Sequence, residues 1–264
     1  IDNSTVIVKD SSNNKVRGKI KYFSAERRVR FNPHRFLREN ETYTINLTKD
    51  IKSDNGTGLN SDFTWSFTTE IKDTDNDGIL DIDDNDDDND GVDDSSDFLK
   101  GINASHIKTD IVGLTVKVND SANISKNFDK KELVQFLVNN SVIIDFNFSF
   151  GQGNVLDLTN MSIQQNDNSS KGYIIINSLI ANDTLKTFYL DNLSSYDGVC
   201  IKDADVDAIG DINSSCKGVF ETFVICPGSA KIYACSMNGT RLKLTGLNHS
   251  AVQLANDIAP PSID

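Results

Sequence analysis

The sequence has no long apolar run, and it contains few Trp, Met, His and Pro residues. Its 264 residues include one Trp, two Met, three His and four Pro. No stretch approaches the 18 or more apolar residues that a membrane-spanning helix requires, so we expect no membrane insertion. Ile1 begins in a polar, strand-like segment with no visible signal peptide, and we expect the mature form of a secreted protein. With 38% hydrophobic residues the chain is typical of a soluble globular protein with room for two β domains.

Catalytic motifs are lacking as well. The three histidines, His34, His106 and His249, are far apart and none has a ligand spacing such as H-x-x-x-H. There is no G-x-S-x-G elbow, no P-loop and no G-x-G-x-x-G that opens a helix. We therefore expect no enzyme and no catalytic residue. The paired carboxylates of a glycosidase cannot be picked out where Asp is this common, so an accessory part of a secreted glycan hydrolase stays an alternative.

Positive charge is absent from one segment, and that segment carries the whole net charge of −13. Between Asp73 and Asp97 there are 13 Asp and no Lys, Arg or Glu. The rest of the chain holds 39 − 13 = 26 acidic residues against 26 Lys and Arg. This balance predicts no nucleic-acid partner and no binding to anionic lipid.

The acidic segment has the spacing of two calcium loops. It reads D-x-D-x-D-G-x-x-D-x-x-D twice, with a period of 13 residues. Alternate carboxylates converge on a hard cation, the glycine permits a sharp turn, the next carbonyl points inward and the last Asp completes the ligand set. The predicted ligands are Asp73, Asp75, Asp77, Ile79, Asp81, Asp84, Asp86, Asp88, Asp90, Val92, Asp94 and Asp97.

Oxygen ligands throughout favour two or more Ca²⁺ ions, since Mg²⁺ prefers a smaller site with bound waters. A disordered acidic linker is the alternative, but it would not keep both glycines in register. The tandem arrangement resembles the thrombospondin type 3 repeat, which implies loops that wind around their ions with little apolar core. With metal bound, we expect residues 71–97 to form a stiff spacer between two β domains.

A second acidic patch follows later in the chain. It comprises Asp203, Asp205, Asp207 and Asp211, and Ala208 stands where a calcium loop would have glycine. A further calcium site is the weaker interpretation here, and a strand with outward-facing Asp residues is the stronger one.

Four cysteines lie close together near the end of the chain. Cys200, Cys216, Cys226 and Cys235 have no C-x₂₋₄-C spacing and no neighbouring His, which disfavours a zinc site. Two disulfides are expected. Three pairings are open, and we favour Cys200–Cys216 with Cys226–Cys235 because each closes a short loop. Such bonds persist in an oxidising, extracellular compartment.

N-glycosylation sequons are abundant. They include 16 of the 29 Asn residues, whereas the Ser and Thr content predicts about five by chance. We expect N-linked glycans on many of them. The sequon residues are Asn3, Asn40, Asn46, Asn55, Asn103, Asn119, Asn123, Asn139, Asn147, Asn160, Asn168, Asn182, Asn192, Asn213, Asn238 and Asn248.

Residues 1–70 alternate apolar and polar side chains in short runs, which predicts a β-sandwich. An ordered series of segments resembles the bacterial Ig-like domain of S-layer proteins: Phe31-Asn32-Pro33, Leu37, Tyr43-Thr44-Ile45, Ile51–Leu59 and Trp65-Ser66-Phe67-Thr68-Thr69. That resemblance implies an Ig-like sandwich. Members of the family usually carry two further strands before the segment that corresponds to Asn3–Val6. Three explanations are open: a strand-deficient sandwich, a chain trimmed at its N-terminus, and a smaller variant of the domain.

Residues 98–264 also read as strands, which predicts a second β-sandwich with two disulfides. Asp129–Val138 is the exception: Asp129 as an N-cap and Glu132 three residues on suit a helix, and we leave helix and strand open there. This part is loosely similar to repeats of archaeal surface proteins, around Val199–Ala204 and Leu244–Ser250.

These features favour a structural subunit of an extracellular filament or surface layer, stiffened by calcium and N-glycosylated. Its main partners would be copies of itself. A strand-deficient sandwich invites strand addition from a neighbouring subunit, and the tail from Ala251–Ala255 onward is the expected donor. The alternatives are an adhesin or carbohydrate-binding module that recognises a surface carbohydrate, and the hydrolase accessory part named above.

Overall fold

The computed structural model describes the chain except residues 1, 3, 24–26, 35–36, 54, 167–171, 178–183, 203, 205, 207, 214, 249 and 257–264. Apart from three single-turn 3₁₀ helices, all regular structure in the described residues is β-strand, which confirms the all-β class. The chain divides into two compact units, Ile1–Asp84 and Asn85–Asp264. The border falls between the two predicted calcium loops, so each loop belongs to a different unit. No helix in the described part is long and apolar enough to cross a membrane.

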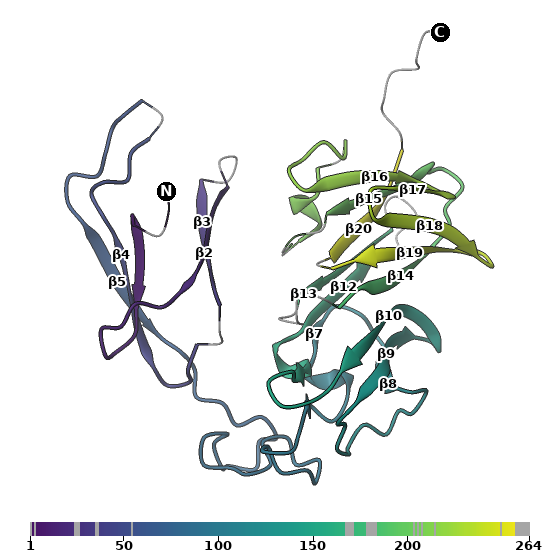
Figure 1. Ribbon diagram of the computed structural model, residues 1–264, viewed down its shortest axis with the longest axis horizontal. Helices are drawn as coiled ribbons and strands as arrows, with labels where there is room; N and C mark the ends of the chain where they lie inside the picture. The colour runs from purple at the N-terminus through teal and green to yellow at the C-terminus, as the bar shows by residue number, and fades with distance from the viewer. Residues whose placement is uncertain are drawn as a thin grey trace. The chain divides into compact units, whose positions relative to one another are not determined.

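The described residues of the N-terminal unit form five strands. They are β1 (Val6–Lys9), β2 (Gly18–Phe23), β3 (Arg28–Pro33), β4 (Thr42–Leu47) and β5 (Phe63–Thr68). Strand β4 pairs with β1 on one side and β5 on the other, both antiparallel, and β2 and β3 form a separate antiparallel hairpin (Figure 1).

The core of this unit is small. Its buried residues are Val6, Val8, Tyr43 and Ile45. Alternation along each strand places these side chains on one face of the three-stranded sheet, and Ile20 of β2 and Phe31 of β3 pack against them. The hairpin therefore covers the sheet over β1 and β4, as the second layer of a sandwich.

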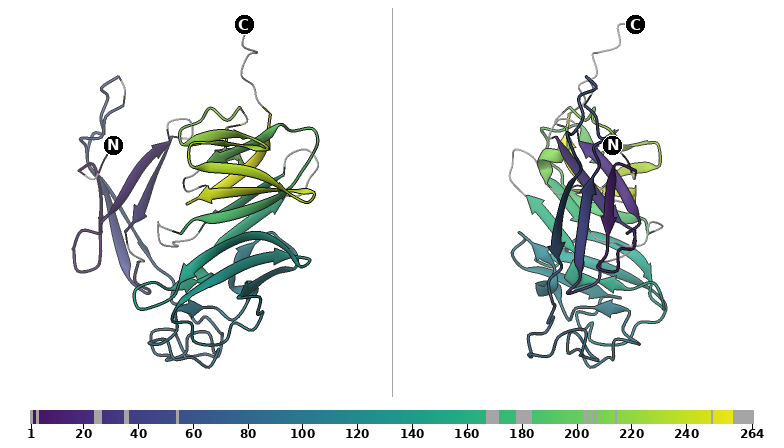
Figure 2. Two further views of the ribbon diagram at one scale, coloured as in Figure 1. Left: turned by 45° about the vertical axis from the view of Figure 1, so that its right-hand side comes forward. Right: turned by 90° about the vertical axis from the view of Figure 1, so that its left-hand side faces the viewer.

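The C-terminal unit is a larger β-sandwich (Figure 2). Its seven-stranded sheet has the order β17-β18-β19-β14-β10-β9-β8, its six-stranded sheet the order β16-β15-β20-β13-β12-β7, and β6 pairs with β11. The strands are β6 (Leu99–Lys100), β7 (Lys108–Thr109), β8 (Leu114–Val118), β9 (Lys131–Val138), β10 (Ser141–Ser149), β11 (Leu156–Asp157), β12 (Ser162–Asn166), β13 (Tyr173–Asn177), β14 (Lys186–Asp191), β15 (Gly198–Lys202), β16 (Glu221–Ile225), β17 (Gly228–Ala230), β18 (Tyr233–Asn238), β19 (Arg241–Leu247) and β20 (Ser250–Ala255).

One continuous core fills this sandwich. Phe136, Phe146 and Phe148 from the seven-stranded sheet share a cluster with Ile163 and Val252 from the six-stranded sheet. Both sheets therefore contribute alternate residues to one apolar layer, as the sequence alternation predicts. A second cluster, with Cys200 and Ile212, lies on the six-stranded sheet and contains residues from the loop after β15.

Asp129–Val138 does not form a helix. Residues Lys131–Val138 form β9, which pairs with β10 over eight residue pairs and with β8 on its other side. Glu132, the residue that suggested a capping box, instead accepts a hydrogen bond from the side-chain amide of Asn119. Pairing on both sides, together with the full burial of Val134 and Phe136, outweighs the local helix signal.

The predicted donor strand is also placed differently. Ala251–Ala255 lies in β20, between β13 and β15 in the six-stranded sheet. Ala251 and Val252 are fully buried there. Donating this segment to a neighbour would require the C-terminal unit to open, so the expectation that it is a free tail is wrong.

Candidate calcium centre and adjoining surfaces

The acidic segment folds into two loops that each bring three carboxylates together. In the first loop, oxygen atoms of Asp73, Asp75 and Asp77 lie within 4.8 Å of one another. In the second, oxygen atoms of Asp86, Asp88 and Asp90 do the same. Three formal negative charges this close repel one another strongly unless a cation lies between them.

The two loops have the same backbone geometry, 13 residues apart. Gly78 and Gly91 have φ angles of 95° and 90°, a conformation that residues other than glycine rarely adopt. Their N–H groups donate to Asp73 Oδ2 at 3.2 Å and to Asp86 Oδ2 at 2.9 Å. The sequence spacing predicts glycine at the sharp turn of each loop. The positive φ angles of Gly78 and Gly91 show why glycine is needed there.

The last carboxylate of each triad is held in the same way in both loops. The N–H of Ile79 donates to Asp77 Oδ1 at 2.8 Å, and that of Val92 donates to Asp90 Oδ1 at 2.7 Å. These short backbone hydrogen bonds fix the carboxylate orientation before any ion binds. The repetition of the same contacts favours one kind of ligand for both loops.

The remaining predicted carboxylate ligands lie outside the two triads. Asp81 accepts hydrogen bonds from the backbone and hydroxyl of Thr74, at 2.7 and 2.8 Å. Asp94 accepts from the side chain of Lys100 at 3.4 Å. Asp97 accepts from the N–H of Leu99 at 2.8 Å. These hydrogen bonds stabilise the loops. Within the part of the chain that the structure describes, Asp81, Asp84, Asp94 and Asp97 are not grouped with either triad.

The second loop is built into the C-terminal unit. Asp88 is 4% exposed and Asp97 is 3% exposed, and the N–H of Gly101 donates to Asp88. Lys100 Nζ lies 2.6 Å from Asp87 Oδ2. Loop and domain thus share hydrogen bonds, so an ion bound in this loop would stabilise the domain.

Burial disfavours the ionised form of the carboxylates in the second loop. It raises the pKa of Asp88 and Asp90 above the usual value, and raises the pKa of Asp97 to about 7. Burial also raises the pKa of Asp87 to about 6, although Lys100 opposes this. A carboxylate that loses water needs compensation from another charge, and a divalent cation provides it.

The residues present fit a hard, oxygen-liganded cation. Asp73 Oδ1 is a buried oxygen atom without a hydrogen-bond partner among the described residues. The triads contain carboxylates alone, with no thiolate or imidazole that would favour a softer metal. Six carboxylates would supply ligand oxygens, and a bound ion would supply the charge that neutralises them.

The cysteines form two disulfides, as predicted. Cys200 is joined to Cys216 and Cys226 to Cys235, the pairing that the short loops favour. A third group of metal-ligating residue types, Cys200, Cys216 and Glu221, is excluded as a thiolate site because its sulfur atoms are bonded to each other.

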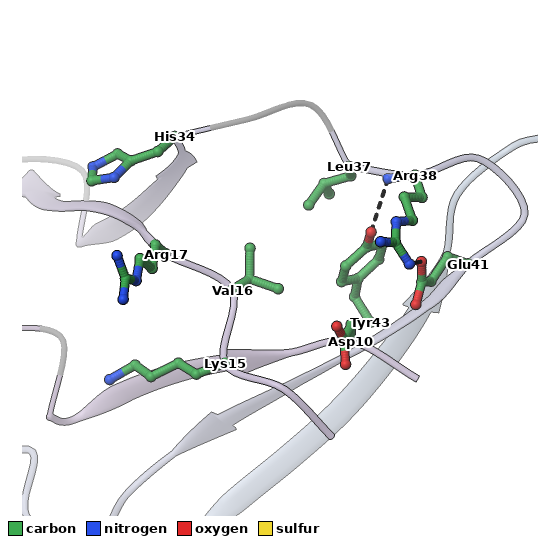
Figure 3. A pocket seen from close by; sticks show the side chains of 9 residues that line it. All are labelled: Asp10, Lys15, Val16, Arg17, His34, Leu37, Arg38, Glu41 and Tyr43. Carbon is green, nitrogen blue, oxygen red and sulfur yellow. Dashed lines mark hydrogen bonds and ion pairs between the residues drawn. The ribbon is translucent and has the colours of Figure 1, made fainter. Parts of the chain in front are cut away.

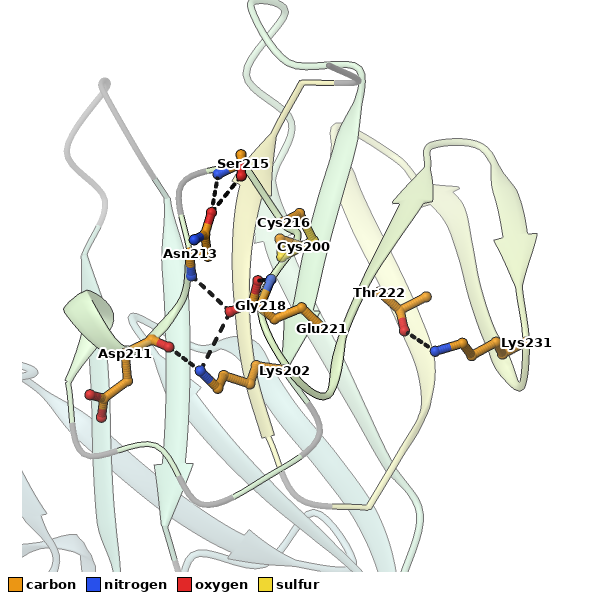
Figure 4. Close-up of a disulfide and its surroundings, with 10 residues drawn as sticks. All are labelled: Cys200, Lys202, Asp211, Asn213, Ser215, Cys216, Gly218, Glu221, Thr222 and Lys231. Carbon is orange, nitrogen blue, oxygen red and sulfur yellow. Dashed lines mark hydrogen bonds and ion pairs between the residues drawn. A yellow bond between two sulfur atoms is a disulfide. The ribbon is translucent and has the colours of Figure 1, made fainter. Parts of the chain in front are cut away.

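Glu221 instead organises the disulfide loop (Figure 4). Its side chain is fully buried and accepts from the N–H groups of Asn213 at 2.7 Å and Gly218 at 2.6 Å. Lys202 Nζ lies 3.4 Å from Glu221 and donates to the backbone carbonyl of Asp211. In the second acidic patch, Asp203, Asp205 and Asp207 lie outside the described residues.

The sequon residues lie at the surface. Three of them, Asn3, Asn168 and Asn182, lie outside the described residues. Of the other 13, 11 are exposed, and Asn46 and Asn248 are partly exposed. In Asn103, Asn123 and Asn213 the side-chain oxygen accepts a hydrogen bond from the N–H of the sequon Ser two residues on.

An aromatic row on β5 is not covered by the hairpin. Phe63, Trp65 and Phe67 are 59%, 42% and 41% exposed. Their cross-strand partners in β4 are Leu47, Ile45 and Tyr43, so the row continues the inner face of the sheet. Among the described strands, β5 pairs with β4 alone and β3 pairs with β2 alone. The inner apolar face thus ends beside open strand edges.

A pocket of about 630 Å³ opens in the same unit (Figure 3). Val16, Leu37 and Tyr43 supply its apolar wall, and Lys15, Arg17 and His34 gather at one side. The other lining residues are Asp10, Arg38 and Glu41. The hydroxyl of Tyr43 accepts a hydrogen bond from the N–H of Arg38 at 2.9 Å, which closes one end.

The fold and these surfaces define an all-β protein with an N-terminal Ig-like domain. Residues 1–69 match the family model described as bacterial Ig-like domain. No curated protein matches the chain. A solved structure of E. coli alpha-2-macroglobulin in its native conformation is similar at 9% identity with a TM-score of 0.25, covering 97% of this chain and 16% of that chain. This chain therefore spans a small part of that protein, and the TM-score defines no shared fold.

The Ig-like domain suggests a surface-associated or structural module, and the disulfides are compatible with an extracellular or surface location. The finer resemblances to S-layer proteins, thrombospondin type 3 repeats and archaeal surface repeats stay predictions.

Proposed function

We propose that this protein is a structural subunit of an extracellular filament or surface layer, with calcium loops that stiffen the connection between its two units. The observation that carries the proposal is the pair of Asp triads, Asp73–Asp75–Asp77 and Asp86–Asp88–Asp90, on either side of the border between the units. Its role is mechanical and not catalytic.

Calcium would act on both units at once. Without an ion, repulsion among 13 Asp residues favours an expanded segment. With ions bound, each loop is tied to its own unit. The first is tied through the N–H of Lys72, which donates to Glu39 Oε2 at 3.2 Å, and the second through the N–H of Gly101, which donates to Asp88. Two loops that follow each other without a free linker restrict how the units move.

N-linked glycosylation is part of the proposed role as an extracellular subunit. The exposed sequon residues leave room for sugars, and no sequon lies between Asp73 and Asp97, where a glycan would obstruct the loops. The two disulfides support the same oxidising compartment.

Assembly is proposed to use strand addition at the N-terminal unit. An extended segment from a neighbouring copy would pair with an open edge and cover Phe63, Trp65 and Phe67. Covering three half-exposed aromatic side chains would contribute about 3 kcal/mol. Because Ala251–Ala255 is already paired within β20, the donated strand would come from another segment of the neighbouring copy.

A carbohydrate-binding role is the second candidate. The pocket beside Val16, Leu37 and Tyr43 is the observation that favours it, since sugar sites combine an apolar wall with polar side chains. Binding of a monomeric protein to a glycan array would support this alternative.

The experiment that tests the structural role is electron microscopy of the purified full chain with Ca²⁺ and with EDTA. We expect filaments or sheets in Ca²⁺ and their loss or disordering in EDTA. A Trp65→Ser variant should remain folded and fail to assemble, while Val112→Ser, at a residue 92% exposed on the C-terminal unit, serves as the matched control. Wild-type protein that stays monomeric in Ca²⁺ at all concentrations contradicts the proposal.

A further inference from the structure

A pocket in the N-terminal unit lies between the connections that flank the β2–β3 hairpin. The segment before β2 supplies Lys15, Val16 and Arg17, and the segment after β3 supplies His34 and Leu37. With a volume of about 630 Å³, the pocket is within the range of sites that bind small molecules. All of its lining residues belong to this unit, so the site is complete in the Ig-like domain alone.

Arg17 and His34 are held together at the end of the hairpin. Gly18 is paired with Pro33 in the strand register. One residue further, the N–H of His34 donates to the carbonyl of Arg17 at 2.9 Å. This backbone contact sets the two residues opposite each other, and Figure 3 shows their side chains at the same side of the pocket.

The two side chains are available to a ligand. Both residues are exposed, and within the described part of the chain no hydrogen bond or ion pair involves the Arg17 guanidinium or the His34 imidazole. A guanidinium presents its N–H donors in a planar fork that matches the oxygen atoms of a carboxylate or phosphate. The imidazole beside it can donate another hydrogen bond, and Lys15 at the same side adds positive charge. This side of the pocket therefore suits an anionic group.

The other side of the pocket carries two carboxylates (Figure 3). Asp10 accepts a hydrogen bond from the N–H of Asn14 at 2.7 Å. Glu41 accepts one from the hydroxyl of Ser11 at 2.8 Å. Each carboxylate has further lone pairs, which can accept hydrogen bonds from the hydroxyl groups of a ligand. Because the same carboxylates repel an anion, the anionic group of a ligand is directed to the Arg17 side.

An apolar wall joins the two polar sides. Val16 and Leu37 are partly buried and pack against the core of the unit, to which Tyr43 belongs. The wall is therefore part of the folded domain and needs no rearrangement to receive a ligand. It matches the C–H groups on one face of a sugar ring, whereas a small inorganic anion would leave it uncovered.

We propose that this pocket binds an acidic saccharide, with the anionic group of the sugar at Arg17 and His34 and its hydroxyl groups toward Asp10 and Glu41. The inference rests on the carbohydrate-binding candidate and names the class of sugar that the site takes. Each part of the pocket then has a matching part of the ligand. A neutral sugar would leave the cationic side without a partner, and a simple anion would leave the apolar wall without one.

The test is titration calorimetry of the full chain with glucuronate, glucose and acetate as probes. We expect glucuronate to bind about tenfold more tightly than either of the other two. Arg17→Gln should lower the affinity for glucuronate about tenfold and leave the affinity for glucose unchanged. Lys19→Gln is the matched control, because it removes the same charge from an exposed residue of β2 that does not line the pocket. It should bind glucuronate as the wild type does.

Three results would overturn the proposal. The first is an equal loss of glucuronate affinity in Arg17→Gln and Lys19→Gln, since the effect would then come from net charge and not from this site. The second is acetate that binds as tightly as glucuronate, which would assign the pocket to simple anions. The third is glucose that binds as tightly as glucuronate, which removes the acidic class but leaves the carbohydrate-binding candidate intact. Binding of neither sugar contradicts both, and the proposed structural role does not depend on it.

Discussion

Substitution of Asp88 by Asn tests the calcium loop where it joins the C-terminal unit. Asp88 is nearly fully buried, accepts hydrogen bonds from the N–H groups of Gly101 and Asp90, and belongs to the second triad. Asn keeps the size and one acceptor oxygen but removes the charge. The substitution should therefore affect the ion more than the fold.

The magnitude follows from linkage. An ion present at about a hundredfold above its dissociation constant stabilises the unit by about 2.7 kcal/mol, and Asp88→Asn should remove most of this. For a unit of this size, Asn85–Asp264, that loss corresponds to a melting temperature about 5–10 °C lower in Ca²⁺. In EDTA the Asp88→Asn variant should melt at the same temperature as the wild type or at a higher one. The reason is that burial makes the Asp88 charge unfavourable without an ion and raises the pKa of Asp88.

The assay is differential scanning calorimetry of the full chain in Ca²⁺ and in EDTA. Asp75→Asn, at the same position of the first loop, should leave the melting of the C-terminal unit unchanged. Asp93→Asn, exposed and outside the predicted ligands, should change neither unit. Equal melting temperatures of the wild type in Ca²⁺ and EDTA, or a loss of stability in Asp88→Asn that is as large in EDTA as in Ca²⁺, would refute the reasoning.

Three further predictions follow from other parts of the molecule. Gly91→Ala should weaken calcium binding at the second loop, because φ is 90° there although no atom lies within 4 Å of the added Cβ; titration with Ca²⁺ would detect it, and unchanged affinity would count against the turn argument. Replacing Cys200 and Cys216 by Ala should cost about 3 kcal/mol for a loop of 16 residues, measured by urea unfolding, and a loss below measurement error would contradict it. The mass of natively purified protein should exceed that of the bare polypeptide through sugars on exposed sequons such as Asn103 and Asn123, and a bare mass would argue against glycosylation.

The geometry of the two acidic loops could be predicted from the sequence because the information that defines it is local. Two glycines in register and Asp at alternate positions define the turn and the triads within each 12-residue stretch, and the structure has both. The disulfide pairing could also be predicted, since Cys226, which follows β16, is only nine residues from Cys235 in β18.

Non-local pairing explains what the sequence left open or mispredicted. Lys131–Val138 is a strand because β8 and β10 lie on either side of it, and nothing within the segment itself reveals those neighbours. Ala251–Ala255 looks like a free tail for the same reason, although it is a central strand between β13 and β15.

One surface could be recognised only from the fold. The apolar pattern of Phe63, Trp65 and Phe67 predicts a buried face, whereas the hairpin covers β1 and β4 and leaves this row exposed.

The central claim is that the acidic segment binds calcium, and titration calorimetry of EDTA-stripped full chain with Ca²⁺ tests it most directly. The account predicts at least two ions per chain for the wild type. Asp75→Asn and Asp88→Asn should each remove one of the two binding events, and the double variant should remove both. Wild-type protein that takes up no Ca²⁺ at millimolar concentrations, while its segment 73–97 keeps the structure described above, would contradict the account.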